Sequence, residues 1–487
     1  MKILKDILYK VAVESVKGST EKEIASIEFD SRKTLNNSIF VAQKGLISDG
    51  HEFIDMAISK GSIAIICEEM PKNMLADITY IKVDDSNKSL AILAANFYNN
   101  PSEKLKLIGI TGTNGKTTVA TLLYRLFKKA GHKVGLLSTI SILVNNDQKS
   151  TSHTTPDSLT INKVLSEMVN KGVEICFMEV SSHGIHQKRT TGLFFEGGIF
   201  TNLTHDHLDY HRSFAEYRDV KKSFFDKMPK SSFALVNIDD KNGEVMLQNC
   251  SAKKYSYAIK TVADYTLKII ENQFNGLLLN IDSHEVWTKL IGSFNAYNLL
   301  AIYACADILG LDKIENLRLI SELENVDGRF QHAISKKGIN SIVDYAHTPD
   351  ALKNVLETIN AIRTHNEQVI TVVGCGGDRD KTKRPKMGHI ASVLSNQVVF
   401  TSDNPRSEDP EEIIKDVEAG VKPENYKKTI SITDRGQAIK TACKLAKHGD
   451  IILIAGKGHE TYQIIGNERL DFDDFKIVNE LLIELNK

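Results

Sequence analysis

Cysteine is sparse in this chain of 487 residues, and no two of its six cysteines form a Cys-x-x-Cys pair. The sequence therefore gives no sign of a disulfide framework or a zinc ribbon. Several cysteines lie inside apolar, strand-like runs, so we expect reduced core thiols and a cytoplasmic protein. Long apolar runs are missing too, because no stretch approaches the roughly 18–20 uninterrupted apolar residues of a membrane span. Lys5, Asp6 and Lys10 interrupt the place where a signal-peptide core would lie.

An excess of charge of either sign is also missing. Sixty-one Lys and Arg residues face 62 Asp and Glu residues, which leaves a formal net charge of −1. There is thus no overall basic field for nucleic acid or an acidic membrane surface. We expect small-molecule substrates, no nucleic-acid or membrane partner, and a monomer. The length favours about three domains.

The most informative stretch is residues 105–118, where an apolar run, a glycine-rich turn and a helical pattern follow one another. Glycines let backbone N–H groups converge on phosphates, and the helix N-terminus adds partial positive charge. Lys116 can reach the β- and γ-phosphates, and the Thr117 hydroxyl can ligate Mg²⁺. Ile110 stands where the usual pattern has a glycine. The order of elements still favours a loop that binds ATP or GTP over a simple turn.

Three blocks divide the chain, at 1–100, 101–328 and 329–487. In the second block, strands alternate with helices, which predicts a mostly parallel sheet covered on both faces. Residues 253–290 show strand-like alternation without helices, so we expect an antiparallel addition there. The third block alternates again and is typical of a doubly wound unit, with functional loops at the carboxyl ends of its strands. The predicted fold class is α/β with three domains.

The expected strands of the first block are 38–42, 62–67 and 78–83. Those of the second block are 133–139, 174–180, 198–202 and 232–238, with helices at 117–129, 159–170, 214–227 and 295–309. Those of the third block are 341–345, 368–373, 397–401, 429–432 and 450–454.

Glu179 closes an apolar run that we expect to lie beside the phosphate loop. A carboxylate at the end of a buried strand is well placed to hold Mg²⁺. It is equally well placed to cap the helix that follows. The local sequence leaves both interpretations open.

Residues 205–211 contain three histidines and two aspartates. Such a cluster can ligate zinc, but no cysteine or second histidine cluster lies nearby. We therefore favour a single imidazole that joins a carboxylate-rich Mg²⁺ site. A polar loop with incidental histidines is the alternative.

Three segments of the last block carry charged side chains after predicted strands. Residues 374–381 and 401–406 combine glycines with arginines, which suits recognition of a carboxylate or phosphate. Residues 456–460 offer backbone carbonyls beside a carboxylate, a combination that fits an ammonium group. Each segment taken alone is also compatible with a surface turn.

Motifs along the whole chain point to one family. In chain order they are residues 30–32 (DSR), 39–42 (IFVA), 112–118 (GTNGKTT), 153–156 (HTTP), 178–184 (MEVSSHG), 206–211 (DHLDYH), 292–298 (GSFNAYN), 344–347 (DYAH), 376–379 (GGDR), 403–406 (DNPR) and 456–460 (GKGHE). In this order they resemble the Mur ligases, the ATP-dependent amino-acid-adding enzymes of peptidoglycan synthesis. Within that family the chain is most similar to the MurE type, which adds the third residue of the stem peptide.

The resemblance implies a domain for the UDP-MurNAc substrate at 1–100, a central ATP-binding domain at 101–328 and a Rossmann-like amino-acid-binding domain at 329–487. The implied ATP contacts are Gly112, Thr113, Asn114, Gly115, Lys116, Thr117, Thr118, Asn295 and Asn298. The implied UDP-MurNAc-dipeptide contacts are Ser31, Thr154, Thr155, Ser181, Gln187 and Arg189. The implied diaminopimelate contacts are Arg379, Asp403, Asn404, Pro405, Arg406, Gly456 and Glu460. At 46–48, where the family has a uridine-contacting stretch, the sequence departs from the family pattern.

The resemblance also implies the catalytic centre. Lys116, Glu179, His207 and Lys221 are the expected catalytic residues, and Thr117, Glu179, His207 and Lys221 the expected Mg²⁺ ligands. Lys221 stands where the family has a carbamylated lysine. Carbon dioxide adds to a neutral amine and turns a cation into an anion that can bind metal. A solvated lysine pair, Lys221 and Lys222, is the simpler alternative.

The reaction implied is phosphorylation of the D-glutamate carboxylate of UDP-MurNAc-L-Ala-D-Glu by ATP, followed by attack of an amine on the acyl phosphate. In the family, arginine at the position of Arg406 accompanies meso-diaminopimelate. Arg406 and Arg379 suit its distal carboxylate, and Glu460 with the Gly456 carbonyl suits its distal ammonium. A lysine-adding ligase, a folylpolyglutamate synthase and a phosphate-loop switch or transport ATPase remain as alternatives.

Overall fold

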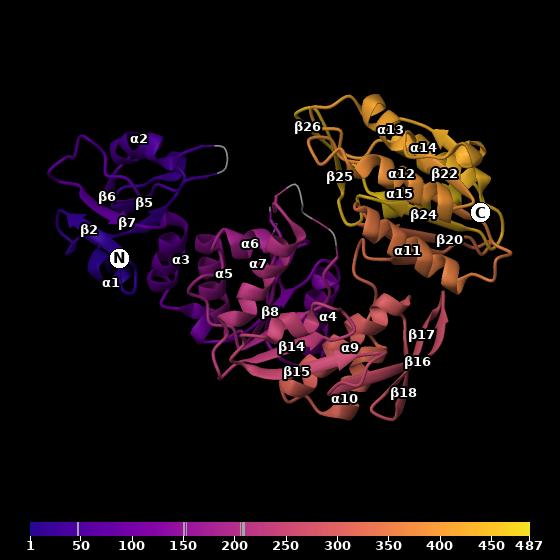
Figure 1. Cartoon of the computed structure of the whole chain (residues 1–487), viewed down its shortest axis with the longest axis horizontal. Helices are drawn as coiled ribbons and strands as arrows, with labels where there is room; N and C mark the ends of the chain where they lie inside the picture. The colour runs from indigo at the N-terminus through magenta and orange to yellow at the C-terminus, as the bar shows by residue number, and fades with distance from the viewer. Residues whose placement is uncertain (46–47, 150, 152, 205, 207–209) are drawn as a thin grey trace.

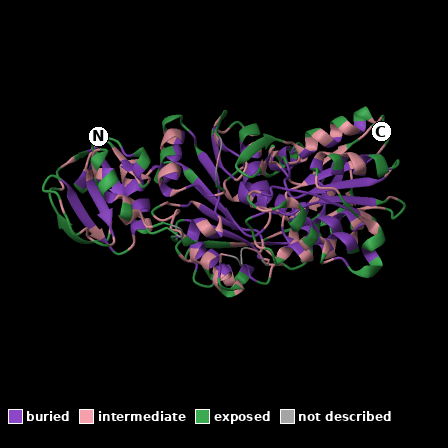
Figure 2. Ribbon diagram, turned by 90° about the horizontal axis from the view of Figure 1, so that it is seen from above, coloured by how far each residue is buried: buried purple, intermediate pink, exposed green. Residues whose placement is uncertain are grey.

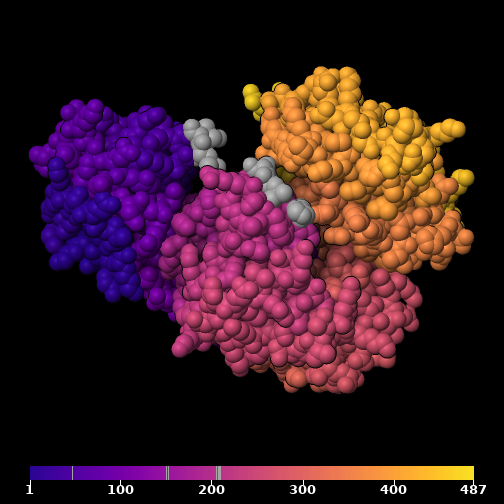
Figure 3. Space-filling view, in the orientation of Figure 1, coloured from indigo at the N-terminus to yellow at the C-terminus, as the bar shows by residue number. Residues whose placement is uncertain are grey.

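The computed structural model describes residues 1–45, 48–149, 151, 153–204, 206 and 210–487. The chain forms three α/β domains, and the central one lies between the other two (Figure 1). In the space-filling view, a hollow opens above the central domain, between the N-terminal and C-terminal domains (Figure 3). The predicted fold class is confirmed. No helix of the described residues is long and apolar enough to cross a membrane.

The N-terminal domain is built on a five-stranded sheet of order β2-β7-β6-β5-β4. Its strands are β2 (Val13–Lys17), β4 (Ser26–Glu28), β5 (Ser38–Val41), β6 (Ser62–Cys67) and β7 (Thr79–Val83), and β1 (Lys2–Ile3) pairs separately with β3 (Glu23–Ile24). Its helices are α1 (Leu4–Ile7), α2 (Ile54–Ser59) and α3 (Ser86–Phe97), with 3-10 turns η1 (Ser31–Lys33), η2 (Gly50–Phe53) and η3 (Pro101–Glu103) at or near its loops. Only β2 runs antiparallel to its neighbour, β7. The three predicted strands match β5, β6 and β7 to within one residue.

The central domain holds an 11-stranded sheet of order β11-β10-β9-β12-β8-β13-β14-β15-β16-β17-β18. The strands are β8 (Lys106–Thr111), β9 (Val134–Leu137), β10 (Ile142–Val144), β11 (Asp147–Lys149), β12 (Ile175–Glu179), β13 (Gly197–Phe200), β14 (Phe233–Asn237), β15 (Lys253–Ala258), β16 (Tyr265–Gln273), β17 (Gly276–Ile281) and β18 (His284–Thr288). The helices are α4 (Lys116–Lys129), α5 (Ser158–Asn170), α6 (Ser182–His186), α7 (Phe214–Asp226), α8 (Gly243–Leu247), α9 (Ser293–Ile308) and α10 (Lys313–Ser321).

The antiparallel addition expected at 253–290 is correct only in part. β17 and β18 are antiparallel, but β15 pairs in parallel with β14 and with β16. A parallel neighbour needs a crossover connection, and the short helix α8 supplies the one between β14 and β15. This helix has only five residues, which are too few to show a helical apolar period, so it was not predicted from the sequence.

The C-terminal domain holds a six-stranded sheet of order β19-β20-β24-β21-β22-β23, in which only β19 is antiparallel. Its strands are β19 (Gln331–Ile334), β20 (Asn340–Asp344), β21 (Val369–Val373), β22 (Gln397–Phe400), β23 (Thr429–Ser431) and β24 (Ile451–Ala455), followed by the hairpin β25 (Tyr462–Ile465) and β26 (Glu468–Asp471). Its helices are α11 (Pro349–Ile362), α12 (Lys383–Leu394), α13 (Pro410–Glu418), α14 (Arg435–Leu445) and α15 (Asp474–Glu484), with the 3-10 turn η4 (Pro423–Lys428). The hairpin was not predicted, because Gln463, Glu468 and Arg469 break the apolar pattern of its strands.

Helices cover both faces of this sheet. Alternate residues of β24 point to opposite sides, so Ile451 and Leu453 pack with α11, α12 and α13, while Ile452 and Ile454 pack with α14 and α15. All five residues of β24 are buried, as expected of a parallel strand covered on both faces. Figure 2 shows buried strands in each of the three domains.

An ion pair with no solvent exposure fixes α14 to α15. Arg435 donates through Nε and Nη2 to the Asp474 carboxylate at 2.8 and 2.7 Å. Arg435 also donates to the carbonyls of Ser402 and Ala455, at the ends of the segments that carry the predicted amino-acid site. The pair therefore links the helix layer to the loops at the carboxyl end of the sheet.

We predict that Asp474→Ala destabilises the C-terminal domain by about 3–5 kcal/mol, because it leaves the Arg435 charge buried without a partner. Chemical denaturation followed by a C-terminal-domain probe measures this loss. Glu480→Ala on the exposed side of α15 is the matched control and should leave the midpoint almost unchanged. Equal midpoints for the two variants would contradict the prediction.

Candidate active site

The phosphate loop lies between β8 and α4 and requires its glycines. Gly112 and Gly115 adopt φ values of +150° and +86°, and a Cβ at either position would collide with Thr201 or Asn298. Asn298 in turn donates to the side chain of Asn295 at 3.0 Å, so α9 supports the loop from below. Backbone atoms of Asn114 bond with Asn202 and Thr201. The loop is thus held in place by the residues that follow β13 and by α9.

Two lysines converge on one carbonyl oxygen of this loop. Lys116 Nζ donates to the Gly112 and Thr113 carbonyls at 3.0 and 2.7 Å, and Lys221 Nζ donates to the same Gly112 oxygen at 2.9 Å. Burial lowers the pKa of Lys116, an effect that the Glu179 and Asp206 carboxylates oppose. Burial, and then the charge of Lys116, hold the pKa of Lys221 well below its ordinary value. Both effects favour the neutral amine of Lys221 over its ammonium form.

The neighbouring lysine behaves differently. Lys222 forms an ion pair with Asp226 at 2.6 Å, one turn further along α7. Lys221 lies instead against the phosphate loop, with its Nζ 4.9 Å from the centre of the Tyr217 ring. The alternative of a solvated pair therefore does not describe Lys221, which is 1% exposed.

Glu179 is fully buried at the end of β12, beside the phosphate loop. Its Oε2 accepts from the Thr117 hydroxyl at 3.0 Å, and its Oε1 accepts from the Thr139 backbone N–H at 2.7 Å. The helix-cap interpretation of Glu179 is wrong, because Ser181 caps α6 by accepting from the Gly184 N–H. A hydroxyl and a carboxylate side by side form a hard oxygen donor set.

The residues expected to hold the muramoyl dipeptide come together around this carboxylate. Thr155 donates to the Glu179 carbonyl at 2.8 Å and accepts from the Ser181 N–H. Arg189 donates to the Thr155 carbonyl at 2.6 Å and twice to the Gln187 side chain. A separate hydrogen bond joins the hydroxyls of Thr139 and Thr154 at 3.0 Å. Residues far apart in sequence are thus joined by hydrogen bonds near the end of β12.

Arg329 joins the C-terminal domain to the phosphate loop. Its Nη2 donates to the Thr117 hydroxyl at 3.1 Å, and its guanidinium lies 4.7 Å from the centre of the Tyr345 ring. Next to it, Asp344 accepts from the Phe330 N–H, and burial raises the pKa of Asp344 to about 6. From the sequence, residues 328–330 mark only a domain boundary, and this role of Arg329 was not predicted. An arginine immediately after a glycine at a domain junction was the available signal.

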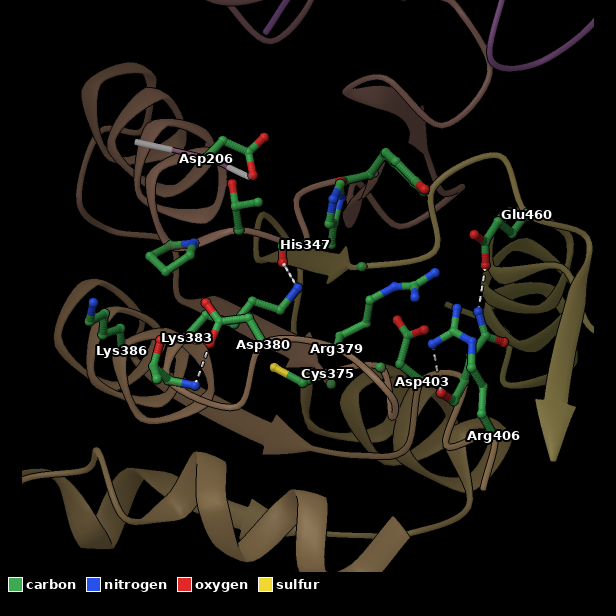
Figure 4. Close-up of a pocket in the computed structure, with 18 of the residues that line it drawn as sticks. Asp206, His347, Cys375, Arg379, Asp380, Lys383, Lys386, Asp403, Arg406 and Glu460 are labelled. Atoms are coloured by element: carbon green, nitrogen blue, oxygen red, sulfur yellow. Dashed lines mark hydrogen bonds between the residues drawn. The ribbon is translucent and has the colours of Figure 1, made fainter. Parts of the chain in front are cut away.

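A cavity of about 930 Å³ lies between the central and C-terminal domains (Figure 4). His183 and Asp206 line it from the central domain. Arg379, Asp403, Arg406 and Glu460 lie together at one side, while Asp380, Lys383 and Lys386 lie at another (Figure 4). Lys383 and Lys386 belong to a local basic cluster, residues 381–386, which the sequence offers as a possible anion site, and His347 belongs to the 344–347 motif. None of the three was predicted to contact the amino acid.

Two loops at the carboxyl ends of β21 and β22 hold Arg379 and Arg406. Arg406 adopts the left-handed backbone conformation, with φ of +54°, and donates to the Gly377 carbonyl at 2.7 Å. Arg384, buried at 1% exposure, donates to both Glu408 oxygens, and Glu408 accepts from the Asp378 N–H. The two loops are therefore joined to each other by hydrogen bonds.

The remaining predicted amino-acid contacts form a second network. Asn404 donates to the Glu460 carboxylate at 2.8 Å, and the Asp403 carbonyl accepts from Gln463. A Cβ at Gly456 would approach the Asp403 carboxylate to 2.5 Å, so the chain passes too closely there for a side chain. Pro405 continues the same loop, and its carbonyl oxygen lies where a Cβ of Gly377 would be.

Some predicted residues are not part of this constellation. Ser31 lies in the N-terminal domain, where its hydroxyl contacts the Met56 sulfur at 3.4 Å. His207, and residues 46–47 of the uridine stretch, lie outside the described residues. Among the residues that are described, no group of three or more His, Cys, Asp or Glu side chains could hold a metal ion. Residues 205 and 207–209, on which the zinc interpretation partly depends, lie outside the described residues, so the structure does not test it.

Comparison with known proteins gives consistent matches over the whole chain. Residues 23–98 match the model described as Mur ligase family, catalytic domain, residues 110–306 the Mur ligase middle domain, and residues 328–458 the Mur ligase, glutamate ligase domain. A UDP-N-acetylmuramoyl-L-alanyl-D-glutamate--2,6-diaminopimelate ligase of Cytophaga hutchinsonii is 53% identical over 99% of this chain and 100% of its own length. The protein of the same name from Bacteroides fragilis is 49% identical over 98% and 99%.

Solved structures agree with this. A UDP-N-acetylmuramoyl-L-alanyl-D-glutamate--2,6-diaminopimelate ligase aligns with a TM-score of 0.70 and 29% identity, covering 100% of this chain and 99% of its own. The MurF ligase of Thermotoga maritima in complex with ADP aligns with a TM-score of 0.63 and 20% identity, covering 94% and 96%, and so shares the fold. The chain belongs to the Mur ligase family.

Proposed function

We propose that this protein is the ATP-dependent ligase that joins meso-2,6-diaminopimelate to UDP-N-acetylmuramoyl-L-alanyl-D-glutamate in peptidoglycan synthesis, forming ADP and phosphate. The names of the full-length relatives, 53% and 49% identical, support the assignment. One structural observation carries it: a single cavity extends from Asp206 to Arg406 and Glu460. Asp206 is also close enough to the phosphate loop to influence the pKa of Lys116 and Lys221.

The domain boundaries at 100 and 328, a cytoplasmic location and a monomeric state remain predictions. So do the ATP contacts at Gly112–Thr118 and at Asn295 and Asn298. They are supported by the loop geometry, in which Lys116 and the N-terminus of α4 present positive charge to an incoming triphosphate.

The residues present fit a magnesium ion. Thr117 and Glu179 place a hydroxyl and a carboxylate oxygen 3.0 Å apart, and both are hard donors. Lys221 would complete the set after carbamylation, in which its neutral amine attacks CO₂ and loses a proton. His207 is the remaining proposed ligand. Bound magnesium would neutralise charge on the transferred phosphoryl group.

The proposed reaction has two steps. A D-glutamate carboxylate oxygen takes the terminal phosphoryl group of ATP, which gives an acyl phosphate and releases ADP. The amine of the amino acid then attacks the carbonyl carbon, and phosphate leaves as the peptide bond forms. Lys116 and Arg329 place positive charge around Thr117, where the phosphoryl group would transfer. Arg189 and its neighbours would hold the acceptor in place for that transfer.

Selection of the amine is assigned to the C-terminal loops. A guanidinium has five N–H donors, and the bond from Arg406 to the Gly377 carbonyl leaves others for a ligand carboxylate. The distal carboxylate of diaminopimelate would bind Arg406 and Arg379, and its distal ammonium would bind Glu460. Lysine lacks that carboxylate and would leave the arginines unpaired. Folylpolyglutamate synthases share the fold at 16% identity, but no described feature of this chain favours a folate acceptor.

The assignment is tested by offering the purified enzyme meso-diaminopimelate, L-lysine and L-ornithine in competition, with ATP, Mg²⁺ and the UDP-linked dipeptide. We expect diaminopimelate to be preferred by at least 10⁴-fold in kcat/KM, because a site built for polar groups rejects a ligand that lacks them. Amine-independent release of phosphate would indicate a simple ATPase. Preference for L-lysine would overturn the substrate assignment.

We predict that Arg406→Ala lowers kcat/KM for diaminopimelate by about 100-fold, since it removes a charge-assisted contact. The KM values for ATP and for the UDP-linked dipeptide should stay within twofold. Arg318→Ala, on the exposed α10, is the control and should behave as the unmodified enzyme. A loss that spreads equally over all three substrates would show that Arg406 does not select the amine.

We predict that Lys221→Met lowers kcat by at least 100-fold, whereas Lys222→Met does not. Because burial and the charge of Lys116 lower the pKa of Lys221, its neutral amine is favoured more than in an ordinary lysine, and acid should remove the carbamate by protonating it. Activity should therefore fall as the pH is lowered. Added bicarbonate should shift this fall in the pH–activity profile to lower pH. A ¹³C-bicarbonate label should give a carbamate NMR signal in the unmodified enzyme and none in Lys221→Met. Absence of that signal from the active enzyme would refute carbamylation.

A further inference from the structure

Lys457 is a fully buried lysine to which the mechanism above gives no task. It has no solvent exposure, yet its ammonium group keeps two polar partners. Nζ donates to Asn404 Oδ1 and to Glu460 Oε2, each at 3.2 Å, and lies 5.4 Å from the centre of the Tyr462 ring. Burial of an ammonium group is costly unless it is paired. Lys457 is therefore held where it is by the two side chains that it contacts.

The contact with Asn404 determines which way that amide points. Asn404 Oδ1 accepts from Lys457 and also from the Ile464 N–H at 2.9 Å. Two donors at one end of the amide identify that end as the oxygen. The Nδ2 group consequently faces Glu460 and donates to its Oε2 at 2.8 Å. If the amide were rotated by 180°, its NH₂ group would face two other donors, the Lys457 ammonium and the Ile464 N–H.

The contact with Glu460 determines which carboxylate oxygen is left for a ligand. Both donors, from Asn404 and from Lys457, reach Oε2. Glu460 lines the cavity together with Arg406, whereas Lys457 lies behind it. Oε1 is thus the oxygen that remains to accept a hydrogen bond on the cavity side. Figure 4 shows Glu460 near Arg406, with a dashed line at the carboxylate oxygen of Glu460 that is already hydrogen-bonded.

We propose that Lys457 is a positioning residue, which acts through Asn404 and Glu460 to direct Glu460 Oε1 toward the distal ammonium of the incoming amino acid. This inference rests on the proposed function, because it presumes a ligand with both a distal ammonium and a distal carboxylate. Lys457 serves the ammonium end, because its hydrogen bonds go to Asn404 and Glu460, whereas the carboxylate end is assigned to Arg406 and Arg379.

The test separates the two ends of the ligand. L-2-Aminopimelate keeps the reacting amine and the distal carboxylate of diaminopimelate but lacks the distal amine. Lys457→Met keeps the apolar stem and removes the ammonium group. We expect this variant to raise the KM for meso-diaminopimelate at least tenfold while changing the KM for L-2-aminopimelate, ATP and the UDP-linked dipeptide less than twofold. An equal rise for both amino acids, or no rise for diaminopimelate, would overturn the inference.

A second comparison guards against misfolding, because Lys457→Met leaves Glu460 without its charge partner. Glu460→Gln and the double variant Lys457→Met/Glu460→Gln have no such unpaired carboxylate. If Lys457 acts through Glu460, the double variant is no worse with diaminopimelate than Glu460→Gln alone. A further tenfold loss in the double variant would overturn the proposal and indicate a general structural role.

The two proposals fail in distinguishable ways. If the unmodified enzyme does not join diaminopimelate to the UDP-linked dipeptide, the proposed function is wrong. If it does so, and Lys457→Met has the same KM for diaminopimelate, only the positioning role is wrong.

Discussion

The convergence of Lys116 and Lys221 on the Gly112 carbonyl is the constraint around which the central domain is arranged. A protonated Lys221 would set its charge against that of Lys116 at one shared oxygen, and burial adds to the cost of holding both charges. Burial and the charge of Lys116 accordingly lower the pKa of Lys221, whereas the Glu179 and Asp206 carboxylates offset part of the effect of burial at Lys116. A ligand with several negative charges would relieve the repulsion between the two lysines. The loop therefore suits a polyanionic substrate.

The sheets of the central and C-terminal domains place functional side chains at the carboxyl ends of their strands. β8, β12 and β13 end at the phosphate loop, at Glu179 and at Thr201, so residues from distant parts of the chain meet there. β21, β22 and β24 end in the same way at the loops that carry Arg379, Arg406 and Glu460. Parallel strands make both arrangements possible, because their carboxyl ends lie at one side of the sheet. Arg329 bonds the C-terminal domain to Thr117 of the phosphate loop, and Asp206 lines, from the central domain, the cavity formed by the C-terminal loops.

Much of this was predictable from the sequence. Buried parallel strands are short apolar runs, and the α4 residues Leu122, Leu123, Leu126 and Phe127 recur at helical spacing, so the main elements were found within a residue or two. The family, the enzyme class and the diaminopimelate assignment followed from ordered motifs. The hairpin β25–β26 and the parallel pairing of β15 were missed, because neither depends on a local apolar period.

Site residues were harder to place, for a physical reason. The role of Arg329 depends on its contact with Thr117, 212 positions away, and that of Lys457 partly on its contact with Asn404, 53 positions away. No local pattern reveals such partners. Glu460 is only three positions from Lys457, but a lysine in a glycine-rich turn is usually solvated, and nothing in residues 456–460 distinguishes a fully buried one. Sequence patterns identify which residue types are available, whereas contacts between distant positions require the fold.

The left-handed backbone at Arg406 limits how this site can evolve. A φ of +54° strains most side chains, least so asparagine and aspartate, and is easiest for glycine, while β-branched residues are strongly disfavoured. Bonds from the Arg406 N–H to Ile464 and from Gly466 to the Arg406 carbonyl fasten this geometry to the hairpin. A descendant enzyme with a different amino-acid preference would therefore not place valine, isoleucine or threonine at this position. Only a few residue types remain by which a substitution here could change the selectivity.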